Sequence, residues 1–105
     1  MALYTFGKPG YVIAQINLKN KEGYKEYVDK VPAIIKNFGG KYLVKAGEFK
    51  SIEGKWDFTR NVVIKFPSYE KALECHNSEE YQAGWSIAKN TTLRNMQIVE
   101  GFSIE

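Results

Sequence analysis

The sequence predicts an α+β domain in which helices cover one face of a four-stranded antiparallel sheet. Four short segments carry the alternating or continuous apolar residues of β-strands. Two of the stretches between them place apolar residues at three- and four-residue spacing, which is typical of amphipathic helices. With 105 residues, the chain has the length of one domain.

The segment Gly10–Leu18 is expected to be the central strand of that sheet. One side of it is entirely apolar and consists of Val12, Ala14, Ile16 and Leu18. The other side is mixed and consists of Tyr11, Ile13, Gln15 and Asn17. Because neither side is fully polar, both faces are expected to be covered, which is typical of a strand inside a sheet.

The first helix is expected after Asn20, whose side chain suits the N-cap position. One apolar stripe follows at helical spacing and consists of Tyr24, Tyr27, Val28, Val31, Ile34, Ile35 and Phe38. Pro32 lies inside this pattern and is expected to kink the helix or to remove one of its hydrogen bonds. Gly39 and Gly40 should end the helix, because glycine tolerates the left-handed conformation found there.

The two middle strands are expected at residues 41–47 and 61–66. A hairpin that turns around Gly54 joins them. A strict two-residue turn would place Lys45 on the same face as Ile64. We therefore expect an odd-length loop or a bulge, with Lys45 on the opposite face beside Lys65.

The second helical region begins at Ser68, a plausible N-cap, and Asn77 and Ser78 interrupt it. Ser78 is followed by two glutamates, which together form a new helix-start signal. The second segment carries Tyr81, Gly84, Trp85 and Ala88 on one face. The last strand is expected at residues 95–102.

The resulting βαββαβ order predicts a ferredoxin-like fold, because right-handed crossovers place both helices on the same face of the sheet. The other face then has no cover from its own chain. Its apolar members are Tyr11, Ile13, Leu43 and Val63. We expect a homodimer in which the two uncovered sheet faces pack together. The alternative is a monomer whose sheet has one face exposed to solvent.

The composition argues against several function classes. The net charge of +3 is mild, and the lysines are scattered without the basic stripe of a nucleic-acid-binding face. No apolar run has the length of a signal peptide or a membrane-spanning helix, so we expect a cytoplasmic protein without a membrane partner. The single cysteine cannot form an intrachain disulfide. No spacing typical of metal ligands, phosphate loops or dinucleotide sites is present, and no cofactor is expected.

Four short motifs occur together in this chain. They are Val-Pro at 31–32, Gly-Gly at 39–40 before KYLV, Phe-Pro-Ser at 66–68 and NSEEY at 77–81. In this combination, and over about residues 10–101, the sequence resembles the DUF1330 family. Residues 1–9, with Gly7 and Pro9, are expected to be a short leader, and a single DUF1330-like domain is expected at 10–105.

That resemblance also implies a dimeric α/β-barrel, the two-subunit form of the ferredoxin-like fold. Families of this kind include cofactor-free oxygenases, isomerases, dehydratase-like proteins and binding proteins, and no settled activity comes with this family. The chain departs from the family pattern at Lys41 and Lys45, where arginine is usual, and at Lys65, where an acid is usual. Loss of the planar guanidinium weakens the case for two-pronged carboxylate binding at these lysines.

His76 is the only histidine and therefore the first candidate for proton transfer near neutral pH. It is expected on the core side of the second helical region, near its break. Two interpretations remain open. One is a general base or polar anchor at a pocket mouth, and the other is a packed histidine that bonds a freed helix carbonyl. The adjacent Cys75 points about 100° away, so the two form no nucleophile–base pair.

Five more residues are candidates for ligand binding. Lys45 and Lys65 would hold an anionic ligand on the uncovered face, or rest their stems on apolar surface with their amines in water. Arg60 and Trp56 flank the hairpin end, where they would clamp a ligand or pin the loop onto a partner subunit. Tyr81 belongs to a helix face toward the sheet, and its hydroxyl either completes the core or reaches a pocket.

Two function classes follow. The first is a protein that binds a small anionic or phenolic molecule in a pocket near the sheet. The second is a cofactor-independent enzyme, similar to oxygenases or isomerases, with His76 as general base. In that enzyme, Lys45 or Arg60 would stabilise developing negative charge.

Overall fold

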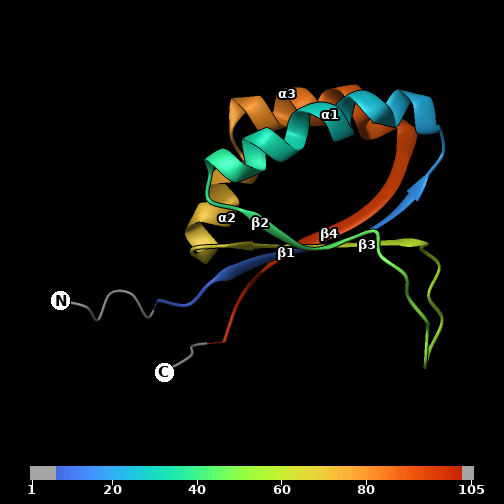
Figure 1. The fold of residues 1–105 in the computed structure, drawn as a ribbon, viewed down its shortest axis with the longest axis horizontal. Helices are drawn as coiled ribbons and strands as arrows, with labels where there is room; N and C mark the ends of the chain where they lie inside the picture. Colours follow the sequence, from blue (N-terminus) through green and yellow to red (C-terminus); the bar gives the residue numbers. More distant parts are fainter. Residues whose placement is uncertain (1–6, 103–105) are drawn as a thin grey trace.

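Helices cover one face of a four-stranded sheet in the computed structural model, which describes residues 7–102 (Figure 1). In chain order the elements are β1 (Gly10–Leu18), α1 (Lys21–Asn37), β2 (Lys41–Lys45), β3 (Arg60–Phe66), α2 (Tyr69–His76), α3 (Glu79–Ala88), the 3-10 turn η2 (Lys89–Thr91) and β4 (Thr92–Glu100). Most of the predicted leader, residues 1–9, lies outside the described residues.

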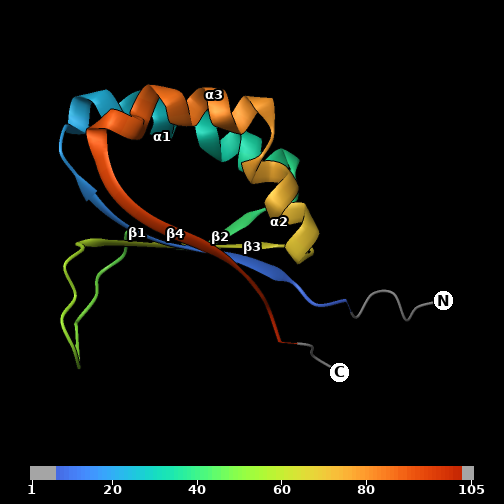
Figure 2. The ribbon, with the colours of Figure 1, turned by 180° about the vertical axis from the view of Figure 1, so that it is seen from behind.

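The strands lie in the order β2-β3-β1-β4, and every neighbouring pair is antiparallel. This confirms the predicted α+β, ferredoxin-like arrangement with β1 inside the sheet. The second helical region consists of two helices, so the helical layer has three members rather than the two predicted. α1 and α3 lie side by side above the sheet, and α2 stands at one end of the layer (Figures 1 and 2).

β1 has the two faces that its sequence predicts. Val12, Ala14 and Ile16 are buried toward the helices. On the other face Ile13 keeps 39% of its surface exposed, because no helix or further strand of residues 7–102 packs there. We call these surfaces the inner face and the outer face of the sheet.

Both ends of α1 follow the predicted local chemistry. The side chain of Asn20 accepts a hydrogen bond from the backbone N–H of Gly23 at 3.1 Å. At the other end Gly39 has a φ of +85°, and the N–H of Gly40 donates to the carbonyl of Ile35 at 2.9 Å. This is a Schellman ending, and it turns the chain directly into β2. Pro32 lies within the helix, where it has no N–H to donate.

The break between α2 and α3 is built around Ser78. Its hydroxyl donates to the carbonyl of Cys75 at 2.7 Å and accepts from the N–H of Tyr81 at 3.2 Å. The hydroxyl therefore closes α2 and opens α3 at the same time. The change of direction brings the rings of His76 and Tyr81 within 5.3 Å of each other.

The predicted position of Lys45 on the outer face is wrong. The pairing of β2 with β3 shifts register between Tyr42 and Val44, which leaves Leu43 as the extra residue of a bulge. Tyr42 is opposite Ile64, and Lys45 is opposite Val62, so both belong to the inner face. The expected bulge exists, but it lies inside β2 and moves Lys45 to the helix side instead of keeping it beside Lys65.

The last strand also starts earlier than predicted. β4 begins at Thr92 rather than at residue 95 and ends at Glu100. Arg94 therefore lies within the strand, directly opposite Ile16 of β1. Since Ile16 is buried on the inner face, Arg94 projects toward the helices as well.

Residues 46–59 form a long loop that extends away from the helices, beyond the outer face (Figures 1 and 2). Asn17 of β1 holds the end of this loop, directly before β3. The amide of Asn17 donates to the carbonyl of Asp57 at 2.8 Å, and its oxygen accepts from the N–H of Thr59 at 2.9 Å. Phe49, Ile52 and Trp56 are exposed along this loop.

Gly10 has no room for a side chain. A Cβ at this position would lie 2.5 Å from the carbonyl oxygen of Ser68 and 2.6 Å from the Cα of Tyr69, both of which are backbone atoms. The start of β1 is therefore in direct contact with the start of α2, and this contact joins the sheet to the helical layer.

We expect Gly10→Ala to lower the free energy of unfolding by about 1–3 kcal/mol, because the backbone of α2 must move to admit the methyl group. Urea denaturation followed by circular dichroism measures this change. Gly47→Ala is the matched control, since a Cβ there meets nothing within 4 Å. Equal stability of the two variants would contradict the close contact at Gly10.

Candidate functional site

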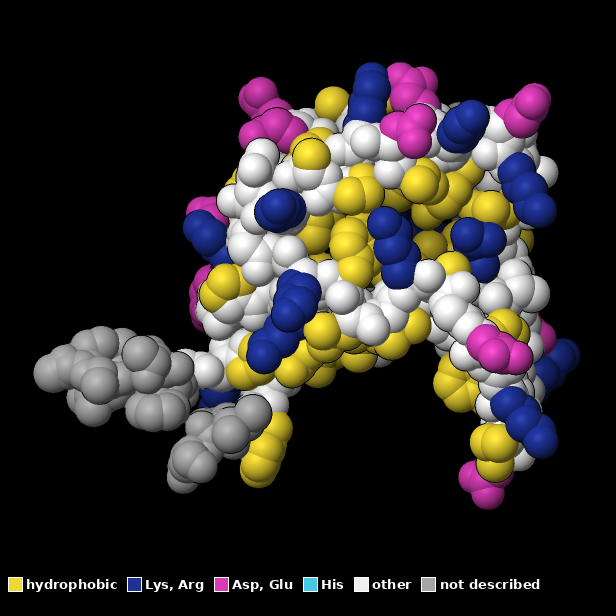
Figure 3. Space-filling model, in the orientation of Figure 1, with side chains coloured by type: hydrophobic (Ala, Val, Ile, Leu, Met, Phe, Trp, Pro, Cys, Tyr) yellow, Lys and Arg dark blue, Asp and Glu magenta, His cyan; other side chains and the backbone are white. Residues whose placement is uncertain are grey.

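A cavity of about 240 Å³ lies between the inner face of the sheet and the helices. Its apolar lining includes Val12, Ala14, Ile16, Val62, Ile64 and Met96 from the strands and Val28, Pro32 and Ile35 from α1. Figure 3 shows hydrophobic side chains at the base of a hollow, with Lys and Arg side chains beside it. Apolar walls with a few polar groups are typical of small-molecule sites.

The charged groups of the cavity are all cationic. Lys45, Arg60 and Arg94 line it together with His76, and no Asp or Glu of the described residues does so. Within residues 7–102, none of these three cations has a carboxylate oxygen within 4.0 Å. The cavity is therefore electropositive and attracts negative charge.

The register of the sheet sets the spacing of these cations. Arg60 of β3 and Arg94 of β4 are both opposite Ile16 of β1. Their Cα atoms are therefore about 10 Å apart, two strand spacings, on one row of the inner face. Lys45 is opposite Val62 and is thus a diagonal neighbour of Arg60 on the same face.

Arg94 is held by two tyrosines. Its Nη1 donates to the hydroxyl oxygen of Tyr81 at 2.9 Å and to that of Tyr27 at 3.2 Å. The two hydroxyls are themselves hydrogen-bonded at 2.8 Å. We call Arg94, Tyr27 and Tyr81 the arginine–tyrosine cluster.

Aromatic rings complete the support of this cluster. The guanidinium carbon of Arg94 lies 3.5 Å from the centre of the Trp85 ring, which is a stacked cation–π contact. Tyr27 packs edge-on to Trp85 with a centroid distance of 5.8 Å and stacks on Tyr24 at 5.2 Å. The guanidinium is thus fixed in both position and plane.

Burial alters the acid–base chemistry of the lining groups. The pKa of His76 is lowered mainly by burial and, to a smaller extent, by the positive charge of Arg94. Its imidazole is therefore neutral at pH 7. Burial, together with Tyr81, raises the pKa of Tyr27, which keeps that hydroxyl a proton donor. Burial raises the pKa of Cys75 to about 11, so its thiol stays protonated and is a poor nucleophile.

The structure brings four of the six predicted site residues together. Lys45, Arg60, His76 and Tyr81 all line the cavity. Lys45 reaches it from the end of β2, with its amine 4.5 Å from the centre of the Tyr42 ring.

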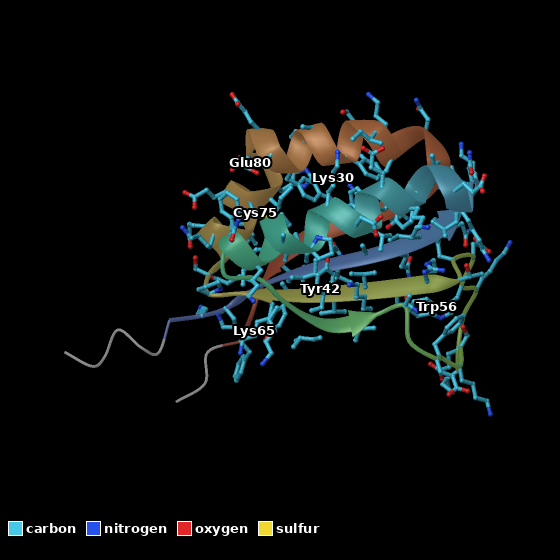
Figure 4. The ribbon with its side chains drawn as sticks, turned by 45° about the horizontal axis from the view of Figure 1, so that its top comes forward. Lys30, Tyr42, Trp56, Lys65, Cys75 and Glu80 are labelled. Carbon is cyan, nitrogen blue, oxygen red and sulfur yellow. The ribbon has the colours of Figure 1, made fainter. Side chains whose placement is uncertain are left out.

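Lys65 and Trp56 lie elsewhere, toward opposite ends of the sheet (Figure 4). Lys65 is opposite Tyr11 on the outer face. Trp56 belongs to the 46–59 loop, where its indole N–H donates to the carbonyl of Glu53 at 2.7 Å. It borders a groove on the outer face, lined also by Gln15, Asn61, Asn95 and Gln97. Neither residue belongs to the cavity.

Sequence reasoning missed Arg94. The last strand was expected to start at Asn95, three residues after its actual start at Thr92, which left Arg94 outside the sheet. The sequence held a partial signal, because Arg94 continues the row of Met96 and Ile98, which alternates with the polar Asn95 and Gln97. A single arginine in an otherwise apolar row marks a cation on a buried face.

The described residues contain neither a metal-ligand cluster nor a membrane-spanning helix. No group of three or more His, Cys, Asp or Glu side chains is placed to hold a metal ion. No helix in residues 7–102 combines the length and the hydropathy needed to cross a membrane.

A family model described as a domain of unknown function (DUF1330) matches residues 9–102 of this chain. No curated protein sequence matches this chain. One similar solved structure is the RPA0582 protein of unknown function from Rhodopseudomonas palustris, with a TM-score of 0.72 at 14% identity, covering 90% of this chain and 83% of that one.

Two further solved structures share the fold. SnoaB, a cofactor-independent oxygenase from Streptomyces nogalater, aligns with a TM-score of 0.57 at 5% identity, covering 94% of this chain and 95% of SnoaB. A dimeric ferredoxin-like protein of unknown function from Thermobifida fusca aligns with a TM-score of 0.51 at 15% identity, covering 97% and 96%. At these identities the likeness concerns the fold alone.

Proposed function

This chain belongs to the DUF1330 family, and we propose that it binds a small organic anion with a flat, apolar body in the cavity between its helices and its sheet. One observation carries the proposal: the apolar cavity has Lys45, Arg60 and Arg94 as its charged lining groups and no acid among the described residues. Cations that lack a carboxylate partner in a partly dry site are stabilised when an anion enters.

The size of the cavity limits the ligand. A volume of about 240 Å³ corresponds to roughly eight water molecules, and hence to a ligand of roughly ten non-hydrogen atoms. The floor consists of aliphatic side chains, and Tyr24, Tyr27 and Tyr42 supply aromatic surface around it. A single-ring compound with one anionic group matches both the volume and the lining.

We expect Lys45→Gln to weaken the binding of benzoate about three- to five-fold, because an exposed charge at the opening contributes about 1 kcal/mol or less. Isothermal titration calorimetry measures the affinity. Lys65→Gln makes the same chemical change on the outer face and should leave the affinity unaltered.

Two results would contradict the proposal. In the first, benzoate and the phenolate anion of 4-nitrophenol both fail to bind the wild-type protein. In the second, both lysine substitutions weaken binding equally. Such a result would mean that the overall charge of the protein, and not the cavity, attracts the ligand. Benzamide, which has the same shape without the charge, serves as the neutral reference ligand.

A second candidate function is proton transfer within the same cavity. His76 supports it, because its ring lines the cavity and the lowered pKa leaves the imidazole neutral and able to accept a proton. A bound acidic C–H or O–H compound would give its proton to His76, and the cations would stabilise the anion that results. The fold it shares with SnoaB is compatible with chemistry that needs no cofactor.

If turnover exists, it should rise with pH through the pKa of His76, which lies below the ordinary value of 6.5, and then stay level. The sign follows because the neutral form is the base, and it predominates above the pKa. His76→Ala should abolish turnover and leave the oligomeric state unchanged. Turnover of His76→Ala with an unaltered pH profile would exclude His76 as the base.

We also propose that two chains pair through their outer faces. Ile13, Leu43, Val44 and Val99 are exposed on strands that carry no helical cover on this side. An apolar sheet surface of this kind is stabilised by a second copy of itself around a two-fold axis. The fold shared with a dimeric protein from Thermobifida fusca supports the proposal.

We expect Ile13→Asp to convert a dimer of about 24 kDa, twice the 12.0 kDa chain, into a monomer, because the buried carboxylate would have no partner. Light scattering after size-exclusion chromatography reports the mass. Ile87→Asp is the matched control, since Ile87 on α3 is similarly exposed at 41% but lies in the helical layer. A wild-type mass of 12 kDa at micromolar concentration would refute the pairing.

A further inference from the structure

The arginine–tyrosine cluster has hydrogen-bond donors in excess. A guanidinium carries five N–H groups, and Nη1 of Arg94, which holds two of them, donates to the hydroxyls of Tyr27 and Tyr81. The Nε–H and the two hydrogens of Nη2 have no hydrogen-bond partner in the part of the chain that the structure describes. Nε–H and one hydrogen of Nη2 lie parallel along one edge of the guanidinium, where a carboxylate binds with both oxygens.

The tyrosines add one further donor. Their two hydroxyl groups have two protons, and only one can lie in the hydrogen bond that joins Tyr27 to Tyr81. The other O–H has no acceptor among residues 7–102. The cluster therefore offers three N–H groups and one O–H group, and it lacks an acceptor. Tyr81 is 3% exposed, and Tyr27 and Arg94 are half-buried, so this O–H is at most partly open to bulk water.

The positions of the two arginines in the chain also favour a ligand with a carboxylate group. The sequence has 15 Lys and Arg residues, and only two of them, Arg60 and Arg94, are arginine. Both lie on the inner face, opposite Ile16. Lysine supplies positive charge, whereas arginine supplies a planar pair of donors that matches the two oxygens of a carboxylate.

We infer that the ligand is a carboxylic acid, and that its carboxylate binds edge-on to the Nε–Nη2 side of Arg94 with a hydroxyl of the arginine–tyrosine cluster as a third donor. This inference rests on the proposed function and names the chemical class that the cavity selects. Arg94 touches the ligand and determines its specificity, and Tyr27, Tyr81 and Trp85 position Arg94.

The rest of the ligand lies over the apolar floor. From the row of Ile16 the floor continues through Ala14 to Val12, about 13 Å along β1. Ala14, the smallest residue of that floor, lies in the middle of it and leaves room for a ring. The class is thus a single-ring aromatic carboxylate, or an alicyclic carboxylate of equal size.

Two probes that differ only in the anionic group test the inference. Benzoate presents two oxygens in one plane, and 4-nitrophenolate, used at a pH where it is ionised, presents one phenolate oxygen to the cation. We expect the wild-type protein to bind benzoate more tightly than 4-nitrophenolate. Arg94→Lys should weaken benzoate binding about ten-fold and 4-nitrophenolate binding much less, because it keeps the charge and removes the planar pair of donors.

Arg60→Lys is the matched control, since it makes the same change at the other arginine of the same row. It should alter the affinities for the two probes to a similar, smaller extent. Equal effects of the two substitutions on both probes would overturn the inference and leave the proposed function standing. Failure of the wild-type protein to bind either probe would refute the proposed function itself.

A second measurement needs no substitution at Arg94. Because the chain has only two arginines, its ¹⁵N NMR spectrum contains only two arginine Nε–H signals. Benzoate should shift the Arg94 signal and slow its exchange with water, whereas 4-nitrophenolate should perturb it less. Tyr81→Phe assigns the signal and should reduce the benzoate-induced shift, since it removes one of the groups that fix the guanidinium. A response confined to the Arg60 signal would overturn the inference.

Discussion

The register of β1 against its two neighbours is the constraint on which the rest of the molecule depends. β1 pairs with β3 from Gly10 to Ile16 and with β4 from Gly10 to Leu18. Since strand residues alternate between faces, this register decides which side chains line the cavity and which lie on the outer face. A slip of one residue would exchange the two sets, so the cationic cavity and the apolar outer face are consequences of the same pairing.

Much of the fold followed from local patterns in the sequence. The alternation in β1, the cap at Asn20, the paired glycines after α1 and the new start at Ser78 each have a local cause that a short window of residues reveals. The candidate site could be predicted less well, because its geometry depends on pairing between strands. The bulge at Leu43 has no local signal, yet it alone moves Lys45 from one face of the sheet to the other.

The arginine–tyrosine cluster could not be predicted from local sequence patterns either. Tyr27 and Tyr81 were both expected to face the sheet, but their meeting depends on how α1 packs beside α3. Their polar character becomes apparent only once Arg94 of β4 is known to lie beneath them. A core in which three elements each contribute one polar group is satisfied only when those groups find one another, which a one-dimensional pattern does not record.

Contacts on the outer face also help to fix a residue of the inner face, because Thr59 and Arg60 are adjacent in the chain. Asn17 projects to the outer face and holds Asp57 and Thr59 with its side chain. Thr59 directly precedes Arg60, which projects to the inner face and lines the cavity. The position of this cavity-lining arginine is therefore fixed from the opposite side of the sheet, by an amide that does not line the cavity. The 46–59 loop extends away from the domain (Figure 1), and this anchor ties its end to β1 directly before Arg60.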